Sequence, residues 1–247
     1  MRNSSSDACL PIGDGGSEVR WIVKVGGGTV EWDWATGPPE ARSLEPIRKP
    51  GSGAKSRHIP VRAFCMTTRA HITLESGLEH DLLRILDRDR RTVWIAAQPC
   101  RLEWTDDEVG SVTHVPDLLS IDAEGRVTLW DVKPDHAVAG GEFVALADAT
   151  AAASAEVGWT HEVFTGMSDV RRHNLMWLHG YRHRPEWADR WEDQLLERAA
   201  SSSTLGDLLR ESREQAAVVW HLIWNGRLLV DLTTRLGPYS EVVTCPK

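Results

Sequence analysis

The most constraining feature of this sequence is a short strand-like segment that is apolar on both faces. Side chains alternate along a strand, so in residues 126–132 Leu129 shares one face with Asp131, while Trp130 and Val132 lie on the other. A strand of this kind is typical of the centre of a sheet that is covered on both sides. The segment therefore predicts a layered α/β domain rather than an isolated hairpin.

A second strand-like segment precedes the first. Residues 114–121 and 126–132 flank the turn at 123–125, which predicts a hairpin. Asp117 and Asp131 are equidistant from the middle of that turn, so the hairpin register places their carboxylates nearly opposite each other. Two like charges at such positions are destabilising and shift each other's pKa. A divalent cation between them would remove the conflict.

A third acid lies on a predicted helix over residues 76–87. Ser76 can cap this helix, and Glu79 three residues later completes a capping box. At 100° per residue, Glu79 falls inside the arc formed by the apolar side chains of the helix, Leu78, Leu82, Leu83 and Leu86. An acid that faces leucines needs a partner, a proton or a metal ion.

These residue types favour a particular chemistry. Hard oxygen ligands without a His/Cys cluster are typical of Mg²⁺, with Mn²⁺ as the alternative. Lys133 shares a face with Asp131, where an ammonium can orient the attacking water or stabilise charge on a scissile phosphate. We therefore predict a metal-dependent nuclease site; the alternative is an ordinary edge hairpin with solvated Asp and Lys. The nearby histidines, expected to be surface or hydrogen-bonded residues, are His80, His114 and His136.

The chain is long enough for more than one module. Its 247 residues, 41% of them hydrophobic, are sufficient for a real core. We expect a flexible tail at 1–17, a nuclease domain at 18–166, a connecting helix or linker at 167–185 and a C-terminal module at 186–247. That module has three predicted helices followed by a hairpin, which is the order of a winged-helix-like partner or DNA module.

Charge and cysteine usage limit the partners and the compartment. The net charge of −8 excludes a polycationic nucleic-acid binder, but local basic segments remain. The candidate DNA contacts in two such segments are Arg57, Arg62, Arg69, Arg171, Arg172, Arg182 and Arg184. The four cysteines are widely spaced, and neither a signal peptide nor a membrane span is visible, so we expect a cytoplasmic protein.

Several sequence words together resemble a known family. They are, in chain order, Leu74-Glu-Ser-Gly-Leu-Glu79, Ala97-Gln-Pro99, His114-Val-Pro-Asp117, Trp130-Asp-Val-Lys-Pro134, Gly158-Trp159 and Asn174-Leu-Met-Trp-Leu178. Their spacing resembles the PD-(D/E)XK restriction-like nuclease superfamily and, within it, the TnsA-like endonuclease subunit of heteromeric transposases. The resemblance covers roughly residues 58–184. It implies a restriction-endonuclease-like mixed sheet flanked by helices.

The resemblance also implies a function and partners. Members cut double-stranded DNA at the 5′ ends of a mobile element, beside a DDE-type transposase subunit and an AAA+-type ATPase regulator. Carried over by position, Glu79, Asp117 and Asp131 would bind metal and Lys133 would be the catalytic lysine, with Gln98 in a supporting role. Because some members carry Gln at the Asp131 position, the number of metal ions stays open.

Two alternatives remain at this point. The first is a stand-alone nuclease of the same fold that acts in DNA repair or defence without a transposase. The second is a catalytically silent DNA-binding or assembly subunit, in which the C-terminal module recruits a partner and the acids are remnants.

Overall fold

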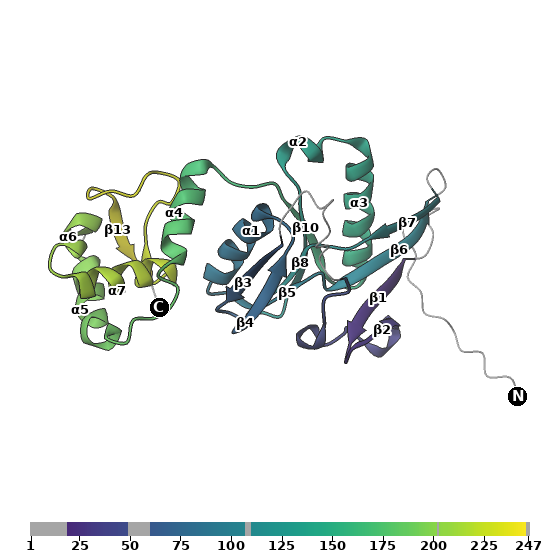
Figure 1. The fold of residues 1–247 in the computed structure, drawn as a ribbon, viewed down its shortest axis with the longest axis horizontal. Coiled ribbons are helices and arrows are strands. Elements are labelled where there is room, and N and C mark those ends of the chain that lie inside the picture. The colour runs from purple at the N-terminus through teal and green to yellow at the C-terminus, as the bar shows by residue number, and fades with distance from the viewer. Residues whose placement is uncertain (1–18, 49–59, 107–109, 202, 246–247) are drawn as a thin grey trace, which may run out of the picture. The chain divides into compact units, whose positions relative to one another are not determined.

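A computed structural model describes residues 19–48, 60–106, 110–201 and 203–245. The chain divides into two compact units (Figure 1). Unit 1 comprises Met1–Leu82 and Thr92–Gly166, and unit 2 comprises Leu83–Arg91 and Met167–Lys247. In the described residues both units combine helices with strands, so the α/β class expected from the sequence is confirmed.

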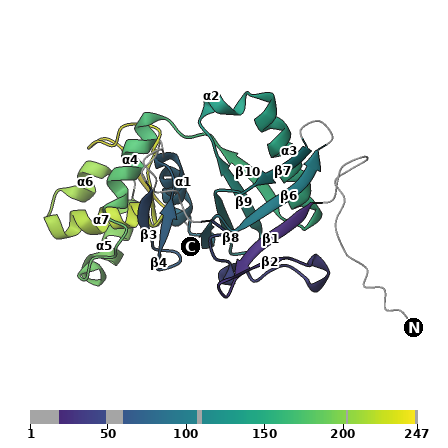
Figure 2. The same ribbon diagram turned by 45° about the vertical axis from the view of Figure 1, so that its right-hand side comes forward.

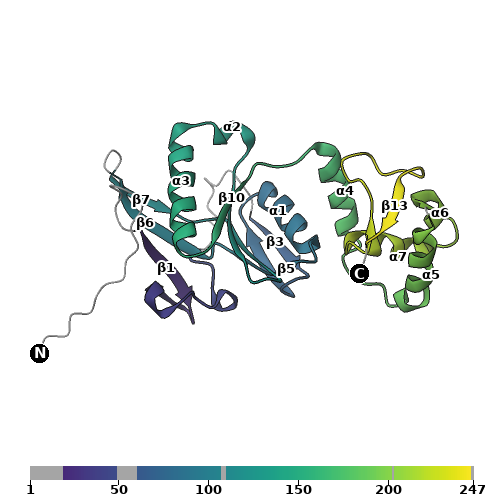
Figure 3. The ribbon, with the colours of Figure 1, turned by 180° about the vertical axis from the view of Figure 1, so that it is seen from behind.

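The strand that is apolar on both faces has a neighbour on each side. The sheet order is β10 (Thr160–Phe164), β9 (Val127–Val132), β8 (Leu118–Asp122) and β5 (Thr92–Ala97). β9 and β10 are parallel, whereas the other neighbouring pairs are antiparallel. Parallel neighbours need a long crossover, which α2 (Asp135–Val138) and α3 (Gly141–Glu156) supply. α3 packs against β10, as Figures 1 and 3 show from opposite sides.

The register of the β8–β9 hairpin is the one the sequence predicts. Leu118 pairs with Trp130 and Ile121 with Val127, so the register is centred on residue 124. It continues beyond the ladder, because the backbone N–H of Asp117 donates to the carbonyl of Trp130 at 2.8 Å. Asp117 is therefore opposite Asp131 on the neighbouring strand.

The hairpin turn is fixed by local side-chain chemistry. Asp122 Oδ1 accepts hydrogen bonds from the backbone N–H groups of Glu124 and Arg126, at 3.0 and 2.9 Å. Gly125 has a φ of 81°, a left-handed conformation that glycine adopts without steric cost. An acid at the start of the turn and a glycine near its end are sufficient to reverse the chain here.

The predicted strand at 114–121 is wrong in one respect: it is two strands in different sheets. β7 (Gly110–His114) ends before β8 begins at Leu118. Proline has no backbone N–H to donate to a ladder, and Pro116 lies at the break. β7 instead completes a second sheet, in the order β2 (Gly28–Glu31), β1 (Arg20–Val25), β6 (Cys100–Asp106) and β7, which Figure 2 shows.

The core of unit 1 includes residues of both sheets. Leu102 on β6 and Leu129 on β9 belong to one buried cluster. Within it the rings of Trp21, Trp34 and Trp159 meet edge to face, with centroids 5.1 to 5.6 Å apart. Such contacts between large rings add to the apolar area that the core removes from water. One core thus contains side chains of both sheets.

The predicted helix at 76–87 is confirmed as α1 (Gly77–Arg88), which follows the antiparallel pair β3 (Val61–Cys65) and β4 (Ala70–Leu74). Ser76 caps it, because its Oγ accepts from the backbone N–H of Glu79 at 3.1 Å. The unit boundary falls within this helix, between Leu82 and Leu83. α1 therefore contributes residues to both units.

Unit 2 contains helices and a small sheet (Figure 1). The helices are α4 (Asp169–His179), α5 (Ala188–Ala200), α6 (Leu205–Leu209) and α7 (Arg213–Trp224). The sheet order is β11 (Ser203–Thr204), β13 (Glu241–Thr244) and β12 (Leu228–Leu229), all antiparallel. The predicted hairpin after α7 is present, whereas β11 was missed because a two-residue strand has no periodicity to detect.

α4 differs from the connecting helix or linker expected at 167–185. Its side chains Leu175 and Leu178 are buried in the core cluster of unit 2, together with Val218 and Leu222 of α7. Asn174 also donates to the carbonyl of Leu232, at 2.9 Å. α4 is thus an integral part of unit 2. Separately, no helix in the described part of the chain is both long and apolar enough to cross a membrane.

Candidate metal-dependent nuclease site

Glu79 points into the protein, as its place on the helical arc predicts. The residue is 5% exposed, and its neighbours on the same face, Leu82 and Leu83, are buried as well. Glu79 Oε2 accepts a hydrogen bond from the backbone N–H of Glu75 at 2.8 Å. Burial raises the pKa of Glu79, and the negative charge of Asp117 raises it further, against the lowering effect of the hydrogen bond.

Asp117 lies just before β8 and is also buried. Its Oδ2 accepts from the backbone N–H of Val132 at 2.8 Å, which ties it to the end of β9. Burial raises the pKa of Asp117, and the charge of Asp131 acts in the same direction. The nearby positive charge of Lys133 acts in the opposite direction without cancelling the rise. Asp117 therefore lies within electrostatic reach of all three other predicted catalytic residues.

Asp131 is completely buried and has two histidine partners. Its Oδ2 is 2.9 Å from Nε2 of His114 and 2.9 Å from Nε2 of His161. Burial raises the pKa of Asp131, but the hydrogen bonds and charges of the two histidines outweigh that effect and lower the pKa to about 2. The second oxygen, Oδ1, is buried and makes no hydrogen bond to the described residues.

Lys133 follows β9 directly. Its backbone N–H donates to the carbonyl of Phe164 at 3.1 Å, which extends the parallel pairing of β9 and β10. The side chain is half-buried, and its ammonium makes no hydrogen bond or ion pair to any residue that the structure describes. An unpaired ammonium beside buried carboxylates is available to a ligand.

Gln98 supports the site through its backbone and its side chain. Its φ of 49° is unusual for a residue other than glycine, and the side chain is only 1% exposed. The backbone N–H donates to the carbonyl of Asp117, and Nε2 donates to Glu75 Oε1, both at 2.9 Å. Arg48 pairs with the other oxygen of Glu75, also at 2.9 Å. The sequence analysis missed Glu75 and Arg48 as members of this network.

Of the three histidines near the acids in sequence, His114 is the one bonded to Asp131, and it is buried and hydrogen-bonded as expected. His161 was missed altogether. It lies on β10, and only the parallel pairing of β10 with β9 brings it to Asp131. No pattern in the sequence specifies which strand of an α/β sheet lies beside which.

The residues available to a metal ion are oxygen donors. Asp131 Oδ1 and Asp117 Oδ1 make no hydrogen bond within the described residues, so each retains acceptor capacity. Burial and the charge of Asp131 raise the pKa of the Cys100 thiol, so this cysteine is a protonated neighbour rather than a thiolate ligand. In the described part of the chain, no set of three or more His, Cys, Asp or Glu side chains is arranged to hold an ion as it stands.

The candidate DNA contacts belong to both units. Arg62 on β3 and Arg69, in the turn after β3, are exposed in unit 1, whereas Arg57 lies outside the described residues. In unit 2, Arg171 and Arg172 are half-buried on α4. The predicted DNA contacts are therefore divided between the two units.

Residues 170–185 contain no Asp or Glu, but at least two of their four candidate arginines already have partners in the fold. Arg184 pairs with Asp189 and Glu192 of α5, at 2.6 and 2.7 Å. Arg182 donates to the carbonyl of His179 at 2.9 Å. Acids that follow in the chain thus neutralise part of the charge assigned to DNA.

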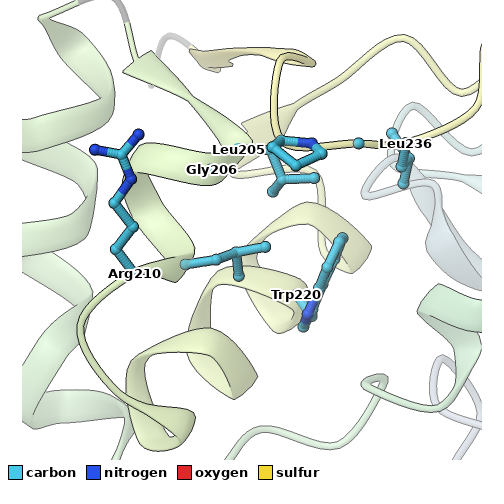
Figure 4. A pocket seen from close by; sticks show the side chains of 8 residues that line it. Leu205, Gly206, Arg210, Trp220 and Leu236 are labelled. Atoms are coloured by element: carbon cyan, nitrogen blue, oxygen red, sulfur yellow. The ribbon is translucent and has the colours of Figure 1, made fainter.

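Unit 2 has a pocket of its own, shown in Figure 4. It has a volume of about 390 Å³ and is lined by residues of α6, α7 and the loop before β13. The labelled side chains Leu205, Trp220 and Leu236 make most of its wall apolar, and Arg210 lies at its side. None of the predicted catalytic residues lines it.

Comparison with known proteins provides no family assignment. No protein family model matches the chain, and no curated protein matches it.

Proposed function

We propose that this chain is a metal-dependent DNA endonuclease of the PD-(D/E)XK type, and specifically a TnsA-like subunit of a heteromeric transposase. The main supporting observation is the buried pair Asp117 and Asp131, opposite each other at the ends of β8 and β9. Glu79 and Lys133 lie within electrostatic reach of that pair. A fold gains no stability from burying three acids near one another, so a ligand is the simplest reason for them.

The donor set suits a small, hard cation. Asp117 and Asp131 each present a carboxylate oxygen that makes no hydrogen bond to the described residues, and Glu79 is buried within electrostatic reach of Asp117. Carboxylate oxygens are the ligands that Mg²⁺ and Mn²⁺ prefer. When bound, the cation would act as a Lewis acid on a phosphate oxygen and offset the repulsion between the acids.

Lys133 supplies the remaining group. Its ammonium is unpaired within the described residues and close to Asp117. It would hold the attacking water by a hydrogen bond, or stabilise the extra negative charge on the phosphate in the transition state. Hydrolysis then leaves a 3′-hydroxyl and a 5′-phosphate.

The fold supports the family proposal. A mixed sheet with an antiparallel hairpin, a crossover helix and a parallel strand fits the restriction-endonuclease-like arrangement that the resemblance implies. In unit 2 the order α5, β11, α6, α7, β12, β13 fits a winged-helix-like module. The resemblance further implies double-stranded DNA, a DDE-type transposase and an AAA+-type ATPase as partners.

The test combines cation titration with cleavage of supercoiled plasmid DNA. We expect Mg²⁺ and Mn²⁺ to bind the wild-type chain and to support nicking when a DDE-type transposase is also present, and Lys133→Ala to bind the cation but not to nick under the same conditions. Lys24→Ala is the matched control, because Lys24 is a lysine of β1 paired with Glu45. It should nick like the wild type.

The outcomes separate the alternatives. Nicking without any partner protein favours a stand-alone nuclease, whereas nicking that requires a transposase favours the subunit. A chain that binds no divalent cation contradicts the nuclease proposal and favours a silent assembly subunit.

A further inference from the structure

The two histidines on Asp131 contact the same carboxylate oxygen. Nε2 of His114 and Nε2 of His161 are each 2.9 Å from Oδ2. Oδ1 of the same carboxylate is buried and makes no hydrogen bond within the described residues. Oδ2 therefore accepts two hydrogen bonds, whereas Oδ1 accepts none from the described residues and keeps its lone pairs for a ligand.

The contact of the two histidines with Asp131 joins strands of two different sheets. His114 ends β7 in one sheet, and His161 lies within β10 in the other. The side chains of His114, His161 and Asp131 are 9%, 2% and 1% exposed. Each imidazole can donate its Nε2–H while neutral, so the arrangement does not depend on the histidines being charged. Asp131 is held from two directions and cannot rotate without breaking a buried hydrogen bond.

We propose that His114 and His161 are positioning residues that force Asp131 to bind the catalytic cation through Oδ1 alone. This inference rests on the proposed nuclease function. Outer-sphere partners of this kind orient a ligand and tune its affinity for the metal. Asp131 would then contribute a single oxygen, never a bidentate carboxylate.

A single-oxygen ligand has a consequence for which cation is bound. Mg²⁺ keeps near-ideal octahedral geometry and takes one oxygen from each carboxylate, whereas Ca²⁺ accepts bidentate carboxylates in a larger and looser shell. The histidines would therefore favour Mg²⁺ over Ca²⁺ at this site. A purely structural role for them would change stability but leave the ratio of the two affinities unchanged.

The test measures that ratio by calorimetric titration of the full chain with Mg²⁺ and with Ca²⁺. His161→Leu removes the donor, frees Oδ2 and should shift the affinity ratio toward Ca²⁺ by about tenfold. His161→Gln retains an N–H donor and should restore the wild-type ratio. His173→Leu, at an exposed histidine of α4, is the matched control and should leave the ratio unchanged.

A crystal structure of the wild-type chain soaked with Mn²⁺ tests the same inference without a variant. We expect the anomalous peak next to Oδ1, with both histidines still on Oδ2. A bidentate carboxylate, a cation on Oδ2, or an unchanged ratio in a folded His161→Leu variant overturns this inference and leaves the nuclease proposal standing. A wild-type chain that binds no divalent cation overturns both.

Discussion

The two units differ in where they place their acids. Unit 1 buries Glu79, Asp81, Asp117 and Asp131. Among the described residues of unit 2, no Asp or Glu is buried, and the acids instead pair with arginines near the surface, as Glu211 does with Arg198. The core of unit 2 is made of apolar side chains such as Val218 and Leu222. Unit 2 thus follows the ordinary rule that acidic side chains stay near solvent. Unit 1 departs from this rule, because it buries a group of acids.

The buried acids of unit 1 are expected to lower the stability of the folded chain, whereas the surface acids of unit 2 are not. Removing a charge from water costs several kcal/mol, and a partner group recovers that cost only in part. The described acids of unit 2 avoid this cost, whereas unit 1 buries acids close to the strand ends that hold Asp117 and Asp131. The following predictions test whether substitutions in the two units respond as this contrast requires.

The largest effect is expected in the apolar core of unit 2. Leu222→Ala leaves a cavity at a fully buried position of α7 and should lower the free energy of unfolding by about 4 kcal/mol. Urea denaturation followed by tryptophan fluorescence measures it. Leu229→Ala, at a position 38% exposed, is the control and should cost far less. Equal losses would mean that the packing of α7 does not determine the stability of this unit.

Removal of Asp131 should also destabilise the chain, for a different reason. Asp131→Ala leaves the buried donors of His114 and His161 without an acceptor, which costs about 2 kcal/mol. The same denaturation experiment measures it, with Asp135→Ala at an exposed position of α2 as the control. A variant as stable as the wild type would show that the histidines find other acceptors.

Removal of the charge of Asp117 should have the opposite sign in the absence of metal. Asp117→Asn keeps an oxygen for the N–H of Val132 and removes a buried negative charge, so the melting temperature should rise by about 2–4 °C, or ~1 kcal/mol. Because burial raises the pKa of Asp117, its contribution to stability is complete below the ordinary pKa of about 4 and is lost as pH rises through the raised pKa. The variant should lack that decline.

Asp122, at the other end of β8, is the matched control, because its contribution to stability should change with pH in the opposite direction. Despite some desolvation, its hydrogen bonds to Arg126 lower its pKa, so its stabilising effect is present above the ordinary pKa and is lost as pH falls. Asp122→Asn should therefore destabilise the metal-free chain at neutral pH. Thermal melts of both variants and of the wild type between pH 2 and pH 8 measure the two slopes, with the Asp122 contribution changing below about pH 4 and the Asp117 contribution above it, and slopes of equal sign would contradict the contrast.

The smallest effect is expected at the surface of unit 2. Glu211→Gln breaks the ion pair with Arg198, whose two side chains are partly or largely exposed, and should cost no more than about 0.5 kcal/mol. The difference should shrink further in high salt because surface charges are screened. A larger loss would mean that unit 2, too, depends on its acids.

The sequence predicted those parts of the site that depend on local periodicity. The pairing of Asp117 with Asp131 follows from the length of one hairpin turn, and the inward direction of Glu79 follows from the helical arc it shares with Leu82 and Leu83. α3 likewise follows from local sequence, because its alanine-rich segment favours a helix by itself.

The remaining parts depend on which segments meet in space. His161 reaches Asp131 only through the parallel pairing of β10 with β9, and Arg184 meets its acids only through the path of the chain into α5. The break at Pro116 was readable in principle, because proline disfavours a continuous ladder, yet the alternation around it concealed the change of sheet. Long-range pairing has no local signature of this kind.

The parallel pairing of β10 with β9 also has a kinetic consequence. It joins two strands that are separated by α2 and α3, so we expect it to form later in folding than the β8–β9 hairpin, whose loop is short. Until β10 docks, Asp131 lacks His161 and Lys133 lacks the carbonyl of Phe164 that fixes its backbone. A chain in which β10 has not docked would accordingly lack the assembled candidate site, so the activity proposed for this chain would depend on completion of the sheet.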